Sequence, residues 1–287
     1  MRFAYYPGCT AKGSTQEIDI ATDRLARHLG IDLIELVDAG CCGSCEIKTI
    51  NPDLHLMLNA RILALADAQG LEILTVCDTC QANLIQTTRR LESDDAKRNA
   101  ITDRLKDAGV SYGRAPRARH FSTILLQDFG RKALAERVAK PLRGLRVASF
   151  TCCHTFRGEG ADNQNRGILQ AMVEITGAQH VAVRGDGDCC GFHILMVKEE
   201  LAARAAGKFL TRCVDEQVDC VVTSSPLCHT ALDIYQKSAE RVAGRAINLP
   251  VLHFEQLIAL SFGIPSGELG LDRHMVPTNS LVAQVAA

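Results

Sequence analysis

The residues of this sequence best suited to chemistry are its 13 cysteines, a heavy load for a chain of 287 residues. A chain of this length can bury a sufficient hydrophobic core without disulfide bonds, so the cysteines are not explained by a need to stabilise a small domain. Cys41 and Cys42 are adjacent in the stretch GCCGSC. Neighbouring side chains on an extended backbone point apart, so such a pair suits a polynuclear cluster better than one metal ion. Thiolates are preferred ligands of zinc and of iron–sulfur clusters, and the pattern therefore predicts a metal centre held by sulfur.

Most of the cysteines fall into three groups, here called stations, and the three stations occur twice along the chain in the same order. Thirty-odd residues separate successive stations in each half of the chain. Each half also closes on a similar segment, HFSTILLQDFG from His120 and HFEQLIALSFG from His253. This self-similarity predicts a duplicated unit with one sulfur-rich site in each copy. The stations are Cys9, then Cys41 and Cys42, then Cys77 and Cys80 in the first half, and Cys152 and Cys153, then Cys189 and Cys190, then Cys228 in the second.

Composition narrows the class of protein. The sequence has neither a charged leader before an apolar run nor about 18 uninterrupted apolar residues, so we expect a cytoplasmic protein with no membrane span. Thiols stay reduced in that compartment, which favours metal ligands or redox groups over disulfides. The net charge of -1 and the scattered basic residues argue against a nucleic-acid partner.

Each station follows an apolar segment typical of a buried strand. Amphipathic helix patterns that end in glycine occupy residues 17–30 and 164–177. Alternating strands and helices predict right-handed crossovers and a parallel sheet, which brings the stations together at the carboxyl ends of the strands. We therefore predict an α/β protein of two pseudo-symmetric half-domains, 1–140 and 141–287, each a small parallel sheet with flanking helices. The predicted strands are 2–6, 32–37 and 71–76 in the first half, and 145–150, 180–184 and 218–223 in the second.

Two glycines and three further cysteines have expected roles of their own. Gly43 and Gly191 follow the two vicinal pairs, where we expect tight turns beside a bulky inorganic group. Cys213 and Cys220 lie outside the repeat on helix and strand patterns, and we expect them to pack in the core. Cys45 is either a sixth sulfur near the first site or simply the start of a helix.

The repeated order of one cysteine, Cys-Cys-Gly and Cys-x-x-Cys resembles the CCG cysteine-rich family, and in particular the B subunit of heterodisulfide reductase. CHTFRG at 153–158 and SPLCH at 225–229 resemble the family's second-half forms. The resemblance implies a fold of two CCG half-domains and non-cubane [4Fe-4S] clusters, each held by five cysteines. It also implies cleavage of a disulfide at a cluster, with electrons from a ferredoxin-like C subunit together with a flavin-bearing A subunit. Related forms act in sulfur oxidisers and in succinate, glycolate and lactate oxidation.

Position by position, the resemblance implies a complete ligand set in the first half and an incomplete one in the second. Ser225 stands where the family motif has cysteine. The serine oxygen or Cys152 would complete that set, or the second half would hold a smaller cluster, zinc or nothing. We expect both halves to bind iron, but differently. The implied ligands are Cys9, Cys41, Cys42, Cys77 and Cys80, followed by Cys153, Cys189, Cys190 and Cys228.

Histidines accompany the second-half cysteines only. His154, His193 and His229 each lie within three residues of one of them, and we predict that they supply protons when a disulfide is reduced. Hydrogen bonding to the backbone or to cluster sulfides is the alternative. The sequence contains neither the closely spaced cysteines of a ferredoxin nor a dinucleotide fingerprint, so partner subunits must carry the electrons. We predict a protein that reduces a disulfide or oxidises thiols within such a complex; an electron-relay subunit or a zinc-bearing assembly module are the alternatives.

Overall fold

The computed structural model describes residues 1–155 and 167–286 of the chain. It contains two four-stranded parallel sheets, with strand orders β2-β1-β3-β4 and β6-β5-β7-β8. The two orders correspond strand for strand, which confirms the prediction of two pseudo-symmetric α/β halves. The strands are β1 (Arg2–Tyr6), β2 (Asp32–Glu35), β3 (Ile73–Thr75) and β4 (Ala118–His120), and then β5 (Arg146–Phe150), β6 (Gln179–Val181), β7 (Cys220–Thr223) and β8 (Val251–His253).

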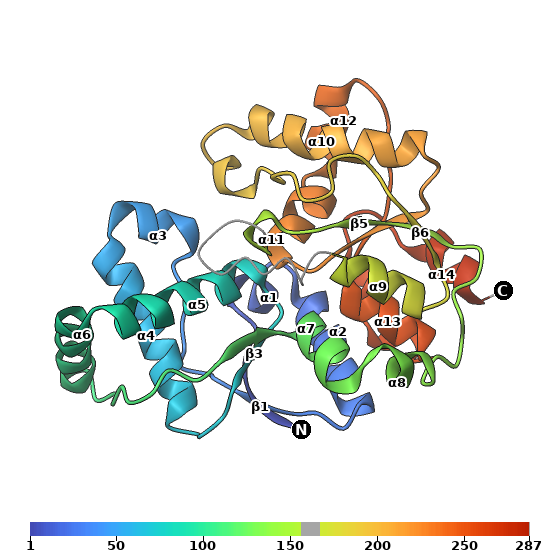
Figure 1. The fold of residues 1–287 in the computed structure, drawn as a ribbon. Coiled ribbons are helices and arrows are strands. Elements are labelled where there is room, and N and C mark those ends of the chain that lie inside the picture. Colours follow the sequence, from blue (N-terminus) through green and yellow to red (C-terminus); the bar gives the residue numbers. More distant parts are fainter. Residues whose placement is uncertain (156–166, 287) are drawn as a thin grey trace.

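Helices flank both sheets (Figure 1). The expected first-half helix is α2, whose buried residues Ile18, Ala21 and Leu25 recur at helical spacing. Asn51 begins α4 by accepting a hydrogen bond from the Leu54 amide at 3.0 Å. The helices are α1 (Cys9–Lys12), α2 (Gln16–His28), α3 (Ser44–Ile50), α4 (Pro52–Asp67), α5 (Asp78–Ser93), α6 (Asp95–Asp107), α7 (Phe121–Ile124), α8 (Arg131–Ala135), α9 (Ile168–Ile175), α10 (Glu199–Asp215), α11 (Pro226–His229), α12 (Gln236–Ala243), α13 (Phe254–Ser261) and α14 (Asn279–Ala286).

All six predicted strands are present, and the structure adds a fourth strand to each sheet. These are β4 and β8, three residues each, and His120 and His253 are the last residues of the two strands. Both strands run straight into a helix, α7 and α13. A strand this short leaves no alternating pattern to detect, so the repeated His-Phe of the closing segments was its only signal. The predicted second-half helix is α9, and the first three residues of its predicted range lie outside the described residues.

The two halves share one hydrophobic core. Ile18 and Leu25 of α2 belong to the same buried cluster as Leu257 and Ile258 of α13 and Val173 of α9. Figure 1 shows α13 and α9 lying against α7 and α2 of the first half. Two smaller clusters, one in each half, contain the buried cysteines of the stations. The predicted boundary at residue 140 therefore divides the sheets but not the core.

The segment after Gly263 packs onto the body of the protein. Leu269, Leu271 and Leu281 are buried, and Asp233 accepts a hydrogen bond from the Met275 amide at 2.8 Å. In the described part of the chain, no helix combines the length and apolar character needed to cross a membrane.

Candidate metal centres and the residues between them

The first-half stations converge at the carboxyl edge of their sheet. The Cys9 and Cys41 sulfurs lie 3.4 Å apart, and Cys80 donates a hydrogen bond to the Cys42 sulfur at 3.5 Å. Cys77 joins Cys42 and Cys80 in one buried cluster. Within the vicinal pair, Cys41 contacts the exposed Cys9 and Cys42 contacts the buried Cys80. The five sulfurs form an outer pair and an inner trio.

Hydrogen bonds among these thiols distribute their acidity unevenly. Cys41 and Cys80 donate hydrogen bonds that lower the pKa of the Cys42 thiol to about 4. The pKa of Cys80 is raised, mainly because Cys80 is the donor in its hydrogen bond to Cys42. Cys42 thus ionises before Cys80, and it is 3% exposed. A buried thiolate needs a positive partner, and a metal cluster would provide one.

The second-half stations converge in the same way. The thiols of Cys153 and Cys189 lie close enough to shift each other's pKa, and these partly and fully exposed residues correspond to the outer pair Cys9 and Cys41. Cys190 hydrogen-bonds to the buried Cys228. Cys152 is 2% exposed, and its neighbours Cys153 and then Cys228 lower the pKa of its thiol to about 7. Cys152, Cys190 and Cys228 lie in one buried cluster.

The glycines after the vicinal pairs have the predicted turn conformation, but their missing side chains make room for helices. Gly43 and Gly191 have φ of 80° and 86°. A Cβ atom at Gly43 would lie 2.9 Å from the Ile47 Cβ, and one at Gly191 would lie 2.7 Å from the Ala202 Cα. The turns are those expected, and the contacts of the added Cβ atoms give a second reason for glycine at both positions. The glycine that does face sulfur is Gly8, where a Cβ would lie 3.0 Å from the Cys80 sulfur.

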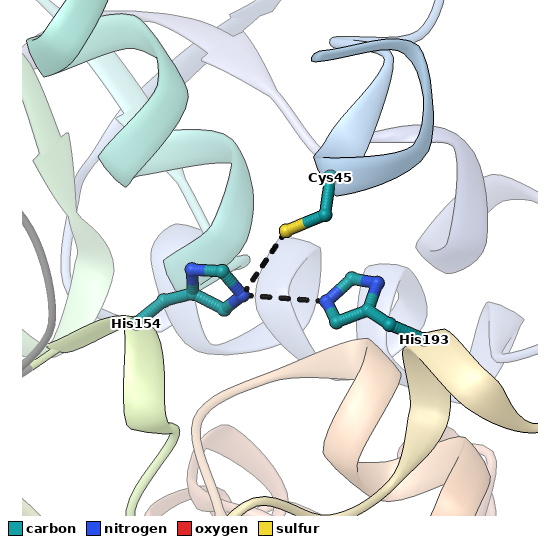
Figure 2. Close-up of side chains that lie close together, drawn as sticks. All are labelled: Cys45, His154 and His193. Carbon is teal, nitrogen blue, oxygen red and sulfur yellow. Dashed lines mark hydrogen bonds between the residues drawn. The ribbon is translucent and has the colours of Figure 1, made fainter. Parts of the chain in front are cut away.

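Cys45 meets two histidines of the other half (Figure 2). Its sulfur lies 3.7 Å from His154 Nε2, which lies 3.3 Å from His193 Nε2. Cys45 lies in the first turn of α3, as one of the two interpretations expected, but its neighbours are these imidazoles rather than the first-site sulfurs. Glu46 accepts a hydrogen bond from His193 Nδ1 at 2.9 Å, which turns Nε2 toward Cys45 and His154. We call Cys45, His154 and His193 the inter-half triad.

The contacts within the inter-half triad shift the pKa values of Cys45 and His193 in opposite directions. Hydrogen bonds from His154 and then His193 lower the pKa of the Cys45 thiol to about 6. The hydrogen bond to Cys45, and then that to Glu46, raises the pKa of His193 to about 9. Between these two pKa values the pair is a thiolate and an imidazolium, so the triad holds a proton at His193 near neutral pH.

We expect Cys45 to be the reactive free thiol of the protein. At pH 7, iodoacetamide should alkylate it while the cluster ligands are protected by iron, with a rate midpoint near pH 6 instead of about 8.5 for an ordinary cysteine. His193→Gln removes a proton donor, so the midpoint should rise and the rate at pH 7 should fall on the order of tenfold. Mass spectrometry of anaerobically purified protein measures both, with the buried Cys213 as the unreactive control. A thiol that reacts only after a chelator is added would instead indicate a metal ion in the triad.

His229 lies apart from the other two histidines. It is fully buried, and its Nε2 lies 3.2 Å from Glu17 and 4.0 Å from Asp233. Its ring packs edge-on against His274 at a centroid distance of 5.0 Å. The helix α11 directs His229 into the interior between the halves, and its expected role as a proton donor stays a prediction.

Asp78 joins the stations of the two halves. Its carboxylate accepts hydrogen bonds from Thr155 at 2.8 Å and from Ser224 at 2.7 Å. Asp78 follows Cys77, Thr155 follows His154, and Ser224 precedes Ser225, so the two sheet edges face each other. Sequence reasoning missed both Asp78 and Glu46. Their only signal was a carboxylate next to a cysteine at the start of a helix.

The remaining predicted residues lie as follows. Cys213 and Cys220 are fully buried in the core, as expected, and burial raises the pKa of both thiols. Residues 156–158 of the CHTFRG motif lie outside the described residues. All cysteines are free thiols.

The donor sets fit a polynuclear iron–sulfur group better than a single ion. In the first half, five free thiols from three stations lie in one chain of contacts, whereas one tetrahedral ion takes four ligands. The division into an outer pair and an inner trio lets different thiolates bind different irons. Gly8 leaves space beside the inner sulfurs.

Comparison with known proteins gives independent findings. A family model described as the CCG cysteine-rich domain matches residues 3–85 and again 147–233. The 8-methylmenaquinol:fumarate reductase membrane anchor subunit of Wolinella succinogenes is 34% identical, covering 97% of this chain and 98% of that protein. The B subunit of a Methanosarcina acetivorans CoB-CoM heterodisulfide reductase is 27% identical, covering 99% and 97%. A crystal structure of a hypothetical protein from Helicobacter pylori shares the fold, with TM-score 0.78 and 16% identity over 96% of this chain and 52% of that one.

Proposed function

Because the chain belongs to the CCG family of cysteine-rich domains, we propose that it is the iron–sulfur subunit of a heterodisulfide-reductase-like complex. It would reduce a disulfide or, in reverse, oxidise thiols or sulfane sulfur. The relatives are subunits of reductase complexes, which supports the more general statement that this chain is a subunit of an oxidoreductase. The observation that carries the sulfur chemistry is the inter-half triad, whose members each lie within three residues of a proposed cluster ligand.

The first-half cysteines would hold a non-cubane [4Fe-4S] cluster, and the second half would hold a second iron–sulfur cluster. When bound, these clusters supply the electrons that break the sulfur–sulfur bond. The proposed ligands are Cys9, Cys41, Cys42, Cys77 and Cys80 in the first half, and Cys153, Cys189, Cys190 and Cys228 in the second.

Reduction of a disulfide consumes two electrons and two protons and releases two thiols. His193 holds one of these protons at Nε2, because Glu46 orients the ring and the Cys45 thiolate stabilises its charge. His154 Nε2 lies within reach of both groups and can pass a proton between them. In the reverse direction the same groups accept protons from the thiols. We assign His229 to holding the two halves together, since it is enclosed by Glu17 and Asp233.

Partner subunits would move the electrons. The sequence has no ferredoxin-type cysteine run and no dinucleotide fingerprint, so we propose a ferredoxin-like C subunit together with a flavin-bearing A subunit. A cytoplasmic location remains a prediction.

The test is turnover of a disulfide by anaerobically purified protein with a reduced dye as donor. We expect His193→Gln to lower kcat about a hundredfold while iron, sulfide and visible spectrum stay unchanged. His28→Gln alters an exposed histidine outside the site and is the matched control. Equal rates for the two variants would contradict the role of the triad.

A relay subunit of a quinol-linked dehydrogenase is the second candidate. The Wolinella relative, named as a membrane anchor within a fumarate reductase, favours it. Clusters that accept electrons from the dye, with no turnover of any disulfide offered, would support the relay. Visible absorption separates both from the zinc alternative, because zinc is colourless.

A further inference from the structure

The two halves differ at a pair of corresponding positions. The first half has Gly8 and Cys77, whereas the second has Cys152 and Ser225. Gly8 and Cys152 each stand two residues after the first strand of their half, which ends at Tyr6 in β1 and Phe150 in β5.

Cys77 and Ser225 correspond just as closely. Each stands two residues after the third strand of its half, β3 or β7. The Cys77 amide donates to the Thr75 hydroxyl at 3.4 Å, and the Ser225 amide donates to the Thr223 hydroxyl at the same distance. The second half has therefore gained a sulfur at one station and lost one at another, while the backbone at the altered third station matches that of the first half.

The two positions approach the same sulfur. In the first half, a Cβ at Gly8 would lie 3.0 Å from the Cys80 sulfur and 4.0 Å from the Cys77 Cβ. Cys228 is the counterpart of Cys80, and Cys152 lies with Cys228 and Cys190 in one buried cluster. The thiol of Cys152, in the loop after β5, thus reaches the space that a cysteine at position 225 would have occupied.

Burial gives a second, independent observation. Cys152, Cys190 and Cys228 are 2%, 6% and 2% exposed, close to the 3%, 4% and 4% of Cys42, Cys77 and Cys80. The Ser225 hydroxyl is fully buried and has no hydrogen-bond partner in the part of the chain that the structure describes. A neutral hydroxyl is a poor ligand for soft metal centres.

We propose that Cys152 is the fifth thiolate of the second site, in place of the residue at position 225. This inference rests on the proposed function, since it presumes that the second half binds an iron–sulfur cluster. The second site then has two vicinal pairs. Cys153 joins Cys189 on the outside while Cys152 joins Cys228 within, just as Cys41 and Cys42 diverge in the first half. The two clusters have equal numbers of thiolates, but one thiolate arrives from a different direction, so their electronic signatures differ.

The experiment compares iron, acid-labile sulfide and electron paramagnetic resonance spectra of the wild type and its variants, all purified without oxygen. We expect Cys152→Ala to lose about half of the iron and the second-site signal, while Ser225→Ala keeps both. The double variant Cys152→Gly with Ser225→Cys should regain the iron, with a second-site signal that resembles the first. The first-site signal within each variant shows that the protein has folded, and Cys213→Ala is the control for loss of a buried thiol.

Three outcomes would overturn the inference. Cys152→Ala could keep both signals, Ser225→Ala could lose the second one, or the double variant could stay without it while the first signal persists. A wild-type protein that contains no iron in its second half would instead overturn the proposed function. The two failures are therefore distinguishable.

Discussion

Replacing Cys80 with serine is expected to remove about half of the bound iron and sulfide and to abolish disulfide turnover. Cys80 is 4% exposed and donates a hydrogen bond to Cys42, whose thiol pKa is lowered to about 4. A serine there keeps the shape of the side chain but offers a neutral hydroxyl to a soft metal centre. The buried Cys42 thiolate then loses the cluster that balances its charge. Iron analysis and paramagnetic resonance of anaerobic protein measure the loss.

The matched control is Cys213→Ser, which makes the same substitution at a fully buried cysteine that belongs to neither proposed ligand set. It should lower stability while both clusters persist. A Cys80→Ser protein with full iron and an unaltered first-site signal would contradict the assignment of Cys80 as a ligand. Loss of both signals in both variants would mean that buried thiols matter here for folding rather than for iron.

Replacing Gly191 with alanine is expected to lower the thermal midpoint by about 6 °C or more. The residue has φ of 86°, a conformation that costs a residue with a Cβ about 1–2 kcal/mol. The new Cβ would also lie 2.7 Å from the Ala202 Cα, and backbone atoms of a helix cannot move aside cheaply. Such overpacking typically costs about 1–3 kcal/mol, so the total is about 3 kcal/mol. Thermal unfolding followed by circular dichroism gives the midpoint.

Gly144→Ala separates the two causes. Gly144 has φ of 81°, and a Cβ there would meet no atom of the described residues within 4 Å. Only the backbone cost then applies, and we expect a shift of about 2 °C. Equal shifts for the two variants would show that contact with α10 is not what requires glycine after the second vicinal pair.

Much of the fold could be predicted because its signals are local. Buried strands such as β1 and β5 and the helix α2 follow from apolar spacing, and the repeated cysteine stations identified the duplication. The fourth strands were missed because three residues give no periodicity. The approach of Ala202 to Gly191 could not be predicted, because Ala202 belongs to a helix whose position no local pattern records.

The sequence by itself determined the chemistry: thirteen thiols, their order in two copies, and histidines beside the second set. Residue type decides which metals and protons a side chain can hold, and strand order decides that the stations meet at one edge. Only the tertiary structure decided which of these side chains lie together. The facing sheet edges bring Cys45 to His154 across 109 positions of the chain, turn His229 inward, and set Cys152 against Cys228. These pairings depend on how two sheets pack through a shared core, and that packing is a sum of many weak contacts with no signature in any single segment.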